Sequence, residues 1–392
     1  MVADSTAAAP TVAARVGAAV EAARDGSFAE LLELAYVTEN AQSLWDHPDT
    51  MAVVVDAARD GLASDIKASA FLVLAHIAYR LTDAMCVCTY PGLVDVVMAA
   101  VRGDDDGHCL RSEALSVVLG IVCGRHTPSI HEAKSVIFDH PGLVETVLAA
   151  ATGDGVLHVL ALDLIAGLLW TPRSRARFYT EPGFVDLVIE TARATENTAD
   201  VREVGFMVLG NLADGNEVAP LLMARPGFRA FLLDAIGDDV VRHQAAWILC
   251  NLSNSSEAAC ALDAPDVLDA LGALTGHAHM ETRRYSVMAI ANIVGVDAQR
   301  LGAFSIDSRA LGDVVDVLRT ALDAPGLLWG LYEPLLSLRS LCAVQAHRPF
   351  FAGAGLRPLL ERAARCAVDG DDPRSCEYAV AALAHLDAEL AG

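Results

Sequence analysis

Lysine is nearly absent from this chain, and aromatic residues are scarce. Of the 28 basic residues among 392, only Lys67 and Lys134 are lysines, whereas 51 residues are acidic and the formal net charge is −23. Aromatic residues make up 6% of the chain and hydrophobic residues 54%. Nucleic-acid binding needs a basic stripe that neutralises phosphates, so this charge predicts no nucleic-acid partner and favours a protein or peptide partner of basic character.

Long uncharged runs are also missing. The longest segment without Asp, Glu, Lys or Arg is His243–Ser256, which has 14 residues, whereas a bilayer span needs about 20 apolar ones. The segment after Met1 contains Asp4 and no apolar core, unlike a secretory signal. The nine cysteines include no CxxC pair, which favours a reducing compartment and leaves Cys86-Val-Cys88 open as a redox or metal pair. We expect no membrane association and a cytoplasmic protein, with the nucleus as a second compartment.

Enzyme motifs are absent as well. The sequence contains no GxSxG, P-loop, GxGxxG or HExxH motif. A helical-repeat iron hydroxylase would be expected to show several His-Glu pairs, and only His131-Glu132 occurs. His277 and His279 could touch a metal, but a solvated turn is the simpler interpretation. We therefore predict a protein that is not an enzyme and has no catalytic residues, cofactor or metal.

What the sequence does contain is an internal repeat. A Pro-Gly or Pro-Asp pair followed by apolar residues recurs at intervals of 43, 50, 41, 44 and 39 residues, beginning at Pro48, Pro91, Pro141, Pro182, Pro226 and Pro265. Such periods are typical of helical solenoids with two or three helices per unit. Degenerate copies begin near Ala310 and Gly355.

Each unit has the same internal order. A short helix is expected after Pro-Gly, with the proline in its first turn, where a missing N–H is tolerated. A Gly/Asp-rich turn and a longer helix follow, as in 240–254, where Ala245, Ile248, Leu249 and Leu252 fall on one helical face. A shorter third segment, such as 256–264, leads to the next landmark.

The long helices align in a column with polar residues in the later units. The column holds Tyr36, His76, Ile121, Leu168, Asn211, Asn251, Asn292, Ser340 and His385. Four residues before each asparagine stand Met207, Trp247 and Met288, and positions four apart share a helix face. Asn254 and His243 flank the same face. Because an amide can donate and accept at once, this column suits pairing with an extended backbone.

The segment His243–Ser256 resembles the third-helix pattern of the armadillo repeat family, in which an Ala-rich start leads to Trp-x-x-x-Asn-Leu. The resemblance is specific over residues 201–296. Over nearly all of the remaining chain it consists only of the shared repeat length. It implies third helices that line a concave groove. In importin-alpha members the asparagine amides clamp a peptide backbone and the tryptophans stack on basic side chains; Asn211, Asn251, Asn292 and Trp247 match these positions. Only one of the three Asn units carries Trp, and the N-terminal segment has just Arg15 and Arg24, so a complete import adaptor is not expected.

We therefore predict an all-α, right-handed superhelix of about eight or nine armadillo-like three-helix repeats. It would form a single domain over 1–392, with 1–47 and 355–392 as capping partial repeats and 48–354 as central repeats. The predicted function is a scaffold that binds a partner segment in the groove. The groove candidates are Asn211, Trp247, Asn251, Asn292, Met207, Met288, His243 and Asn254.

Several other interpretations stay open beside this one. The asparagines could bond the neighbouring repeat, and Trp247 could serve packing. The acidic turns could cap helices rather than form an acidic edge that steers partners. The protein could also be an armadillo-type exchange factor for Hsp70, or, less in keeping with the sequence, a metal-dependent repeat enzyme. The acidic turn residues are Asp60, Asp65, Asp104 to Asp106, Asp154, Glu196, Asp200, Asp238, Asp239, Glu281, Asp369, Asp371 and Asp372.

Overall fold

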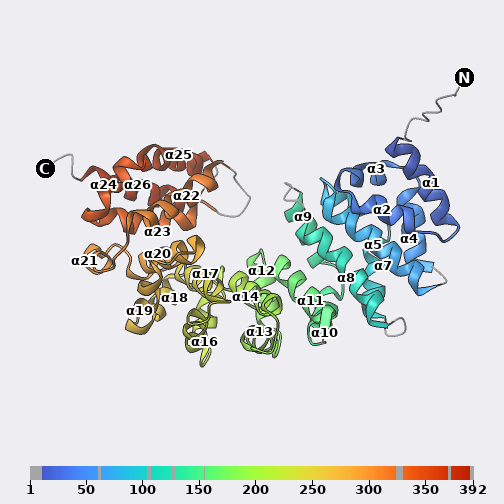
Figure 1. Cartoon of the computed structure of the whole chain (residues 1–392). Helices are drawn as coiled ribbons and strands as arrows, with labels where there is room; N and C mark the ends of the chain where they lie inside the picture. The colour runs from blue at the N-terminus through green and yellow to red at the C-terminus, as the bar shows by residue number, and fades with distance from the viewer. Residues whose placement is uncertain are drawn as a thin grey trace, which may run out of the picture. The chain divides into compact units, whose positions relative to one another are not determined.

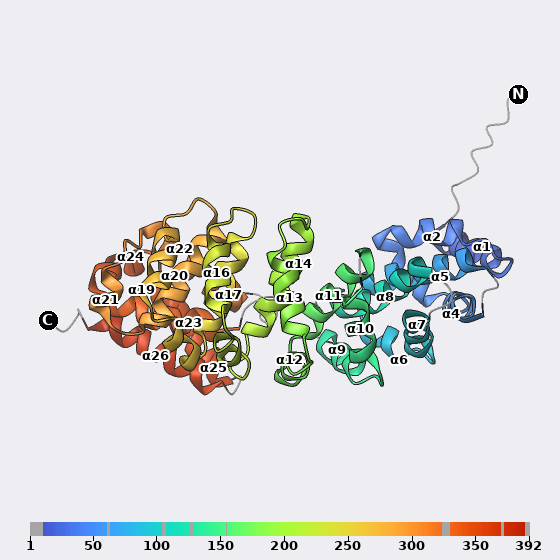
Figure 2. The same ribbon diagram turned by 90° about the horizontal axis from the view of Figure 1, so that it is seen from below.

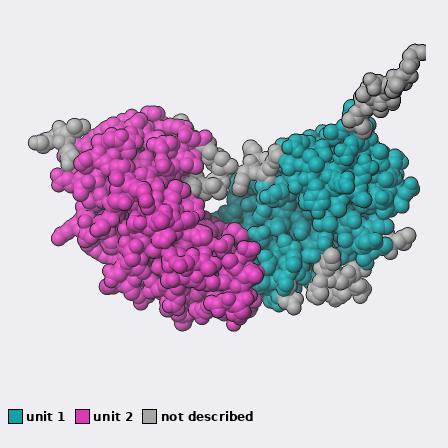
Figure 3. All heavy atoms as spheres, viewed as in Figure 1, with its two compact units in different colours: residues 1–174 teal, residues 175–392 magenta. Residues whose placement is uncertain are grey.

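Every regular element that the structure describes is helical, which confirms the all-α prediction (Figure 1). The computed structural model describes residues 11–60, 63–103, 107–124, 129–153, 155–323, 330–369 and 372–388. The chain divides into two compact units, residues 1–174 and 175–392 (Figure 3). That 1–392 acts as a single domain stays a prediction.

Unit 1 is built from three-helix repeats that each open with a short helix. Two helices come first, and complete repeats follow them, with a 3₁₀ turn, η1 (Thr38–Asn40), before the first. In order the helices are α1 (Val12–Arg24), α2 (Ala29–Tyr36), α3 (Ala41–Asp46), α4 (Thr50–Asp60), α5 (Ser64–Arg80), α6 (Ala84–Thr89), α7 (Leu93–Arg102), α8 (Gly107–Cys123), α9 (Ile130–Phe138), α10 (Leu143–Ala151) and α11 (Gly155–Leu168).

The same order continues through unit 2, with the division of the units inside α12. A second 3₁₀ turn, η2 (Gln345–His347), precedes the last repeat. The helices are α12 (Pro172–Tyr179), α13 (Phe184–Arg193), α14 (Ala199–Ala213), α15 (Ala219–Met223), α16 (Phe228–Ile236), α17 (Arg242–Ser253), α18 (Ser256–Leu262), α19 (Pro265–Leu274), α20 (Met280–Val294), α21 (Ala298–Gly302), α22 (Ser308–Asp323), α23 (Tyr332–Ala343), α24 (Arg348–Gly353), α25 (Leu356–Asp369) and α26 (Pro373–Asp387).

The third helices of successive repeats pack against one another within each unit. In unit 1 they are α5, α8 and α11, and in unit 2 they are α14, α17, α20, α23 and α26 (Figure 2). Their apolar faces are buried: Phe71, Leu74, Phe206 and Leu249 are at most 1% exposed. Full burial of such a side chain stabilises the fold by about 1.5–3 kcal/mol. The high apolar content is therefore used between stacked helices.

The Pro-Gly landmarks lie at the turn between the first and second helix of a repeat, and here one expectation was wrong. At Pro91-Gly92 the N–H of Leu93 bonds the carbonyl of Tyr90 at 3.2 Å, and Gly92 has a φ of 73°. This is a type II β-turn, which takes proline and then a residue with positive φ. The proline thus precedes α7 instead of occupying its first turn. The Pro141, Pro182 and Pro226 turns have the same form, whereas Pro265 does begin α19 as predicted.

The cysteines that the structure describes are free, and several are deeply buried. Cys86 donates to Asp83 at 3.3 Å, and its neighbour Cys88 is 8% exposed. Burial raises the pKa of Cys88 to about 12 and that of Cys342 to about 12, so these thiols stay protonated at neutral pH. In the described ranges, no helix is long and apolar enough to cross a membrane.

Candidate functional site

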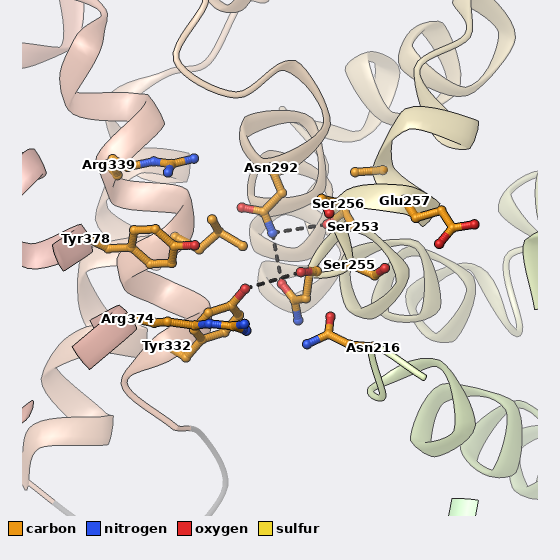
Figure 4. A pocket seen from close by; sticks show the side chains of 13 residues that line it. Asn216, Ser253, Ser255, Ser256, Glu257, Asn292, Tyr332, Arg339, Arg374 and Tyr378 are labelled. Atoms are coloured by element: carbon orange, nitrogen blue, oxygen red, sulfur yellow. Dashed lines mark hydrogen bonds between the residues drawn. The ribbon is translucent and has the colours of Figure 1, made fainter. Parts of the chain in front are cut away.

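The asparagine column of unit 2 forms hydrogen bonds between neighbouring repeats. Asn251 on α17 is 5% exposed, and its Nδ2 donates to the carbonyl of Gly210 on α14 at 2.9 Å. Asn292 on α20 donates to Ser253 Oγ at 3.1 Å and to Asn254 Oδ1 at 3.0 Å (Figure 4). Its own Oδ1 accepts from Ser337 of α23 at 2.9 Å. Both amides therefore link third helices to each other.

Trp247 also packs against the preceding repeat. A Cβ added at Gly210 would lie 2.0 Å from Cζ3 of the Trp247 ring, so only glycine leaves room for the indole at this close contact. The ring is half-buried. The packing interpretation of Trp247 therefore has a direct structural basis, and a role in partner binding stays a prediction.

The remaining sequence candidates occupy mixed environments. Met288 is 0% exposed and has no surface to offer a partner in this structure. Met207, Asn211 and His243 are half-buried on their third helices. Burial, followed by the nearby His279, lowers the pKa of His243, whose ring lies 5.4 Å from that of His279. Asn254 and Asn292 line a cleft, and these two candidates anchor the site described next.

The cleft opens among the third helices of unit 2 and has a volume of about 600 Å³. Five stretches of chain meet there: the turn after α14, the end of α17 with the start of α18, and helices α20, α23 and α26 (Figure 4). The residues that line the cleft include Asn216, Asn254, Ser255, Ser256, Glu257, Asn292, Tyr332, Leu336, Arg339, Arg374 and Tyr378.

Two tyrosines and two arginines form one side of the cleft. Tyr332 donates to the carbonyl of Asn254 at 3.3 Å, and its ring lies 5.6 Å from that of Tyr378. The guanidinium of Arg339 lies over the Tyr378 ring, 4.7 Å from its centroid, a cation–π contact. Burial, followed by the nearby Tyr378, raises the pKa of Tyr332 to about 12, so its hydroxyl remains a donor at neutral pH.

The opposite side of the cleft carries short polar groups. Figure 4 places Asn216, Ser255 and Glu257 across from Arg339, Tyr378 and Arg374. Within the described part of the chain, the Asn216 side chain and the Nδ2 of Asn254 form no hydrogen bond, in contrast with the saturated Asn292 amide. These groups are free to pair with a ligand backbone.

Column alignment alone missed the tyrosines and arginines, although the sequence does carry a signal for them. Tyr332, Leu336 and Arg339 stand at i, i+4 and i+7, and Arg374 and Tyr378 stand at i and i+4. Such spacings place side chains on one helix face. A search for polar and aromatic faces on the last two long helices would have found both sets.

Several acidic turns are engaged within the chain. Asp238 accepts from Arg202 at 2.6 Å, Asp239 pairs with Arg242 at 2.5 Å, and Glu281 pairs with Arg284 at 3.1 Å. Asp372 caps α26 by accepting from the Ser375 N–H at 3.1 Å. At these positions the capping and pairing interpretation holds. Asp104 to Asp106, Asp154 and Asp371 lie outside the described residues.

In unit 1 the column residues are apolar or aromatic, and His76 among them also contacts a charged side chain. Ile121 and Leu168 are at most 1% exposed, and the Tyr36 ring lies 4.2 Å from that of His76. Arg80 contacts His76 Nδ1 at 2.9 Å and donates to the carbonyl of Ala35 at 2.8 Å.

Among the described residues of the whole chain, no group of three or more His, Cys, Asp or Glu side chains could hold a metal ion.

Comparison with known proteins finds solved structures that share this architecture. No family model matches the chain, and no curated protein sequence matches it. Solved structures do: an engineered protein with 19% identity covers 96% of this chain and 98% of its own, with a TM-score of 0.52. The designed armadillo repeat protein YIII(Dq)4CqI, 16% identical, covers 61% of this chain and 98% of its own, with a TM-score of 0.53.

A second design has been solved with a peptide. The designed armadillo repeat protein YIII(Dq.V1)4CPAF in complex with peptide (KR)4 is 18% identical, covers 61% of this chain and 98% of its own, and has a TM-score of 0.53. At these identities the likeness establishes the fold. The chain has an armadillo-like helical repeat fold, as its third-helix pattern predicts.

Proposed function

We propose that this protein is a non-enzymatic scaffold that binds an extended segment of a partner protein in the cleft of unit 2. The observation that carries the proposal is the contrast between amides in one small region. Asn251 and Asn292 are already bonded to neighbouring repeats, whereas Asn216 and the Nδ2 of Asn254 have no partner within the described chain. Free amide groups beside aromatic rings suit a peptide backbone and its side chains.

The dimensions and the fold support this proposal. A volume of about 600 Å³ falls in the range of ligand sites and can hold a few residues of a peptide. Designed armadillo repeats have been solved for modular peptide recognition, and one is in complex with peptide (KR)4. A chaperone-type partner, such as a folded Hsp70 domain, would instead need a broad surface outside the cleft.

Selection of peptides from a random library on the full chain tests the proposal. Asn216 and Ser256 are exposed at the cleft, so Asn216→Trp and Ser256→Trp would fill it without removing a hydrogen bond seen within the described residues. We expect selected peptides to bind the wild type and to lose at least about tenfold in affinity with either filled variant, measured by fluorescence anisotropy.

Val240→Trp is the matched control, because Val240 is exposed in the same unit and does not line the cleft. It should leave the affinity unchanged. Equal binding to the filled variants and the control would reject the cleft as the site. Stimulated ADP release from an Hsp70, or stoichiometric iron or zinc in the purified protein, would favour the co-chaperone or enzyme alternatives.

A further inference from the structure

We propose, resting on the function above, that the Arg339–Arg374 side of the cleft binds an oxyanion carried by the partner segment. The ligand group would be the carboxylate of an acidic side chain or the phosphate of a phosphorylated one. The net charge of the whole chain favours a basic partner, whereas the charge inside this cleft favours an acidic group at this end. The local arrangement decides which group is recognised there.

The first support is that these two arginines are unpaired in a chain rich in carboxylates. Several arginines of unit 2 have acidic partners, among them Arg202 with Asp238 at 2.6 Å and Arg300 with Asp263 at 3.1 Å. Within the described residues, neither Arg339 nor Arg374 forms an ion pair. Two guanidinium groups without an acidic partner therefore line one cleft.

The second support is the geometry around Arg339. Its Nε is buried and has no hydrogen-bond partner in the described chain. The guanidinium is held over the Tyr378 ring at 4.7 Å, which fixes its plane beside the cleft. A planar, pre-positioned guanidinium suits the two oxygens of a carboxylate or a phosphate. Arg374, four residues before Tyr378, lines the same side (Figure 4).

The neighbouring groups leave this side positive. Burial, followed by the nearby Arg348 and Arg339, lowers the pKa of His385 on α26. Glu257 lines the cleft on the opposite side, away from the arginines (Figure 4). Burial, followed by the nearby Asp214 and Asp372, raises the pKa of Glu333, the carboxylate on α23 next to Tyr332. Tyr332 and Tyr378 supply hydroxyl groups beside the two cations.

Peptide pools with one fixed residue test the assignment. Each fluorescein-labelled pool has random positions around a fixed central Glu, phosphoserine, Gln or Lys, and binding to the full chain is followed by anisotropy. We expect the Glu pool, the phosphoserine pool or both to bind about tenfold tighter than the Gln pool, since charge-assisted hydrogen bonds to arginine add that much affinity. The two arms show whether carboxylate or phosphate is the preferred source.

Three variants locate the effect. Arg374→Gln and Arg339→Gln should each reduce the anion preference, and Arg339→Lys should keep part of it, because the charge remains without the planar fork. Arg365→Gln is the matched control, since Arg365 is exposed on α25 and does not line the cleft. A Lys or Gln pool that binds as tightly as both anionic pools, or a preference unchanged in Arg339→Gln and Arg374→Gln, would overturn the assignment.

This experiment separates the two proposals. If the Gln pool binds and is displaced by the Asn216→Trp filling but shows no anion preference, the scaffold function stands and the oxyanion assignment fails. If every pool binds the wild type and the filled variants equally, the cleft itself is rejected and the assignment falls with it.

Discussion

The two units use their third helices differently at equivalent positions of the repeat. In unit 1 the column residues Ile121 and Leu168 are buried among apolar side chains. In unit 2 the equivalent Asn251 and Asn292 bond the preceding repeat, and Asn292 also accepts from the following one. At these column positions the third helices are thus joined by apolar packing in one unit and by directed hydrogen bonds in the other.

The two units also differ in how deeply their most buried ion pairs lie. The ion pairs among the described residues of unit 1 are mostly exposed, such as Arg173 with Asp139, whose side chains are 74% and 51% exposed. In unit 2, Arg283 is 3% exposed, donates to Asp313 at 2.6 Å and bonds the carbonyl of His277 at 2.6 Å. Buried polar groups demand partners in fixed positions, so this pair fixes the contact between α20 and α22 in unit 2.

The largest expected effect tests this difference in burial. Arg283→Met leaves the largely buried carboxylate of Asp313 without its partner, while the His277 carbonyl keeps the hydrogen bond from Arg309 at 2.9 Å. We expect a loss of about 3–5 kcal/mol in the free energy of unfolding. Arg173→Met in unit 1 removes an exposed pair and should cost less than about 1 kcal/mol. Urea unfolding followed by circular dichroism measures both. Equal small losses would show that the buried pair contributes no more than the exposed one.

A reciprocal exchange tests the column itself. Leu168→Asn would bury an unpaired amide in unit 1 and lose apolar burial, so we expect a loss of about 3 kcal/mol. Asn251→Leu would remove one of the two hydrogen bonds that the Gly210 carbonyl accepts in unit 2, because the bond from the Asp214 N–H at 3.1 Å remains. We expect this to cost about 0.5–1.5 kcal/mol. The same unfolding measurement applies. If Asn251→Leu were stabilising, the hydrogen bonds of unit 2 would be dispensable and the two columns would be energetically alike.

The close contact between Gly210 and Trp247 gives a third test. Gly210→Ala forces the indole of Trp247 to move, which costs about 1–3 kcal/mol of stability. The better helix propensity of alanine offsets about 1 kcal/mol of that loss. We expect a net loss of thermal stability. Gly276→Ala is the matched control, because nothing lies within 4 Å of a Cβ added there. In a Trp247→Leu background the Gly210→Ala loss should shrink, and an undiminished loss would refute the steric explanation.

The smallest effect concerns pH. Burial lowers the pKa of His347 in unit 2 and of His76 in unit 1. The unfolded chain then binds protons more readily than the folded one, so stability falls as the pH drops below about 6.5. Urea unfolding at pH 7.5 and 5.5 should show a shallower dependence for His347→Gln, and a smaller change for the half-buried His76→Gln. An unchanged dependence in His347→Gln would exclude this residue as a contributor.

The sequence predicted the repeats well because their signals are local. The apolar spacing in 240–254 predicted a helix there, and the structure has α17 (Arg242–Ser253). The third segment predicted at 256–264 corresponds to α18 (Ser256–Leu262). The proline expectation failed because Pro-Gly can begin a helix or form a type II turn, and the choice depends on the φ of the following glycine. Pro265, followed by Asp266, had no such glycine and began its helix.

The cleft was harder to predict because its residues come from separate repeats. Asn292 was a candidate, but periodicity cannot say whether its amide faces solvent or Ser253 of the preceding helix. Tyr332 and Tyr378 stand 46 positions apart in sequence and meet only through the stacking of α23 on α26. Asn216 lies in a turn, where no period constrains its position. Helix faces can be predicted from spacing, whereas the meeting of several faces depends on tertiary packing.

The Asn292 side chain has a consequence for how unit 2 unfolds. Its hydrogen bonds reach α17 on one side and α23 on the other. Unfolding of either neighbour would therefore leave part of the Asn292 amide on α20 without a hydrogen-bond partner in the chain. In stacked-repeat proteins, the coupling between neighbours sets how many repeats melt together. Strong coupling here should make the repeats around α20 unfold as one block. A pulling experiment on unit 2 should therefore record one large extension step for these repeats instead of several small ones.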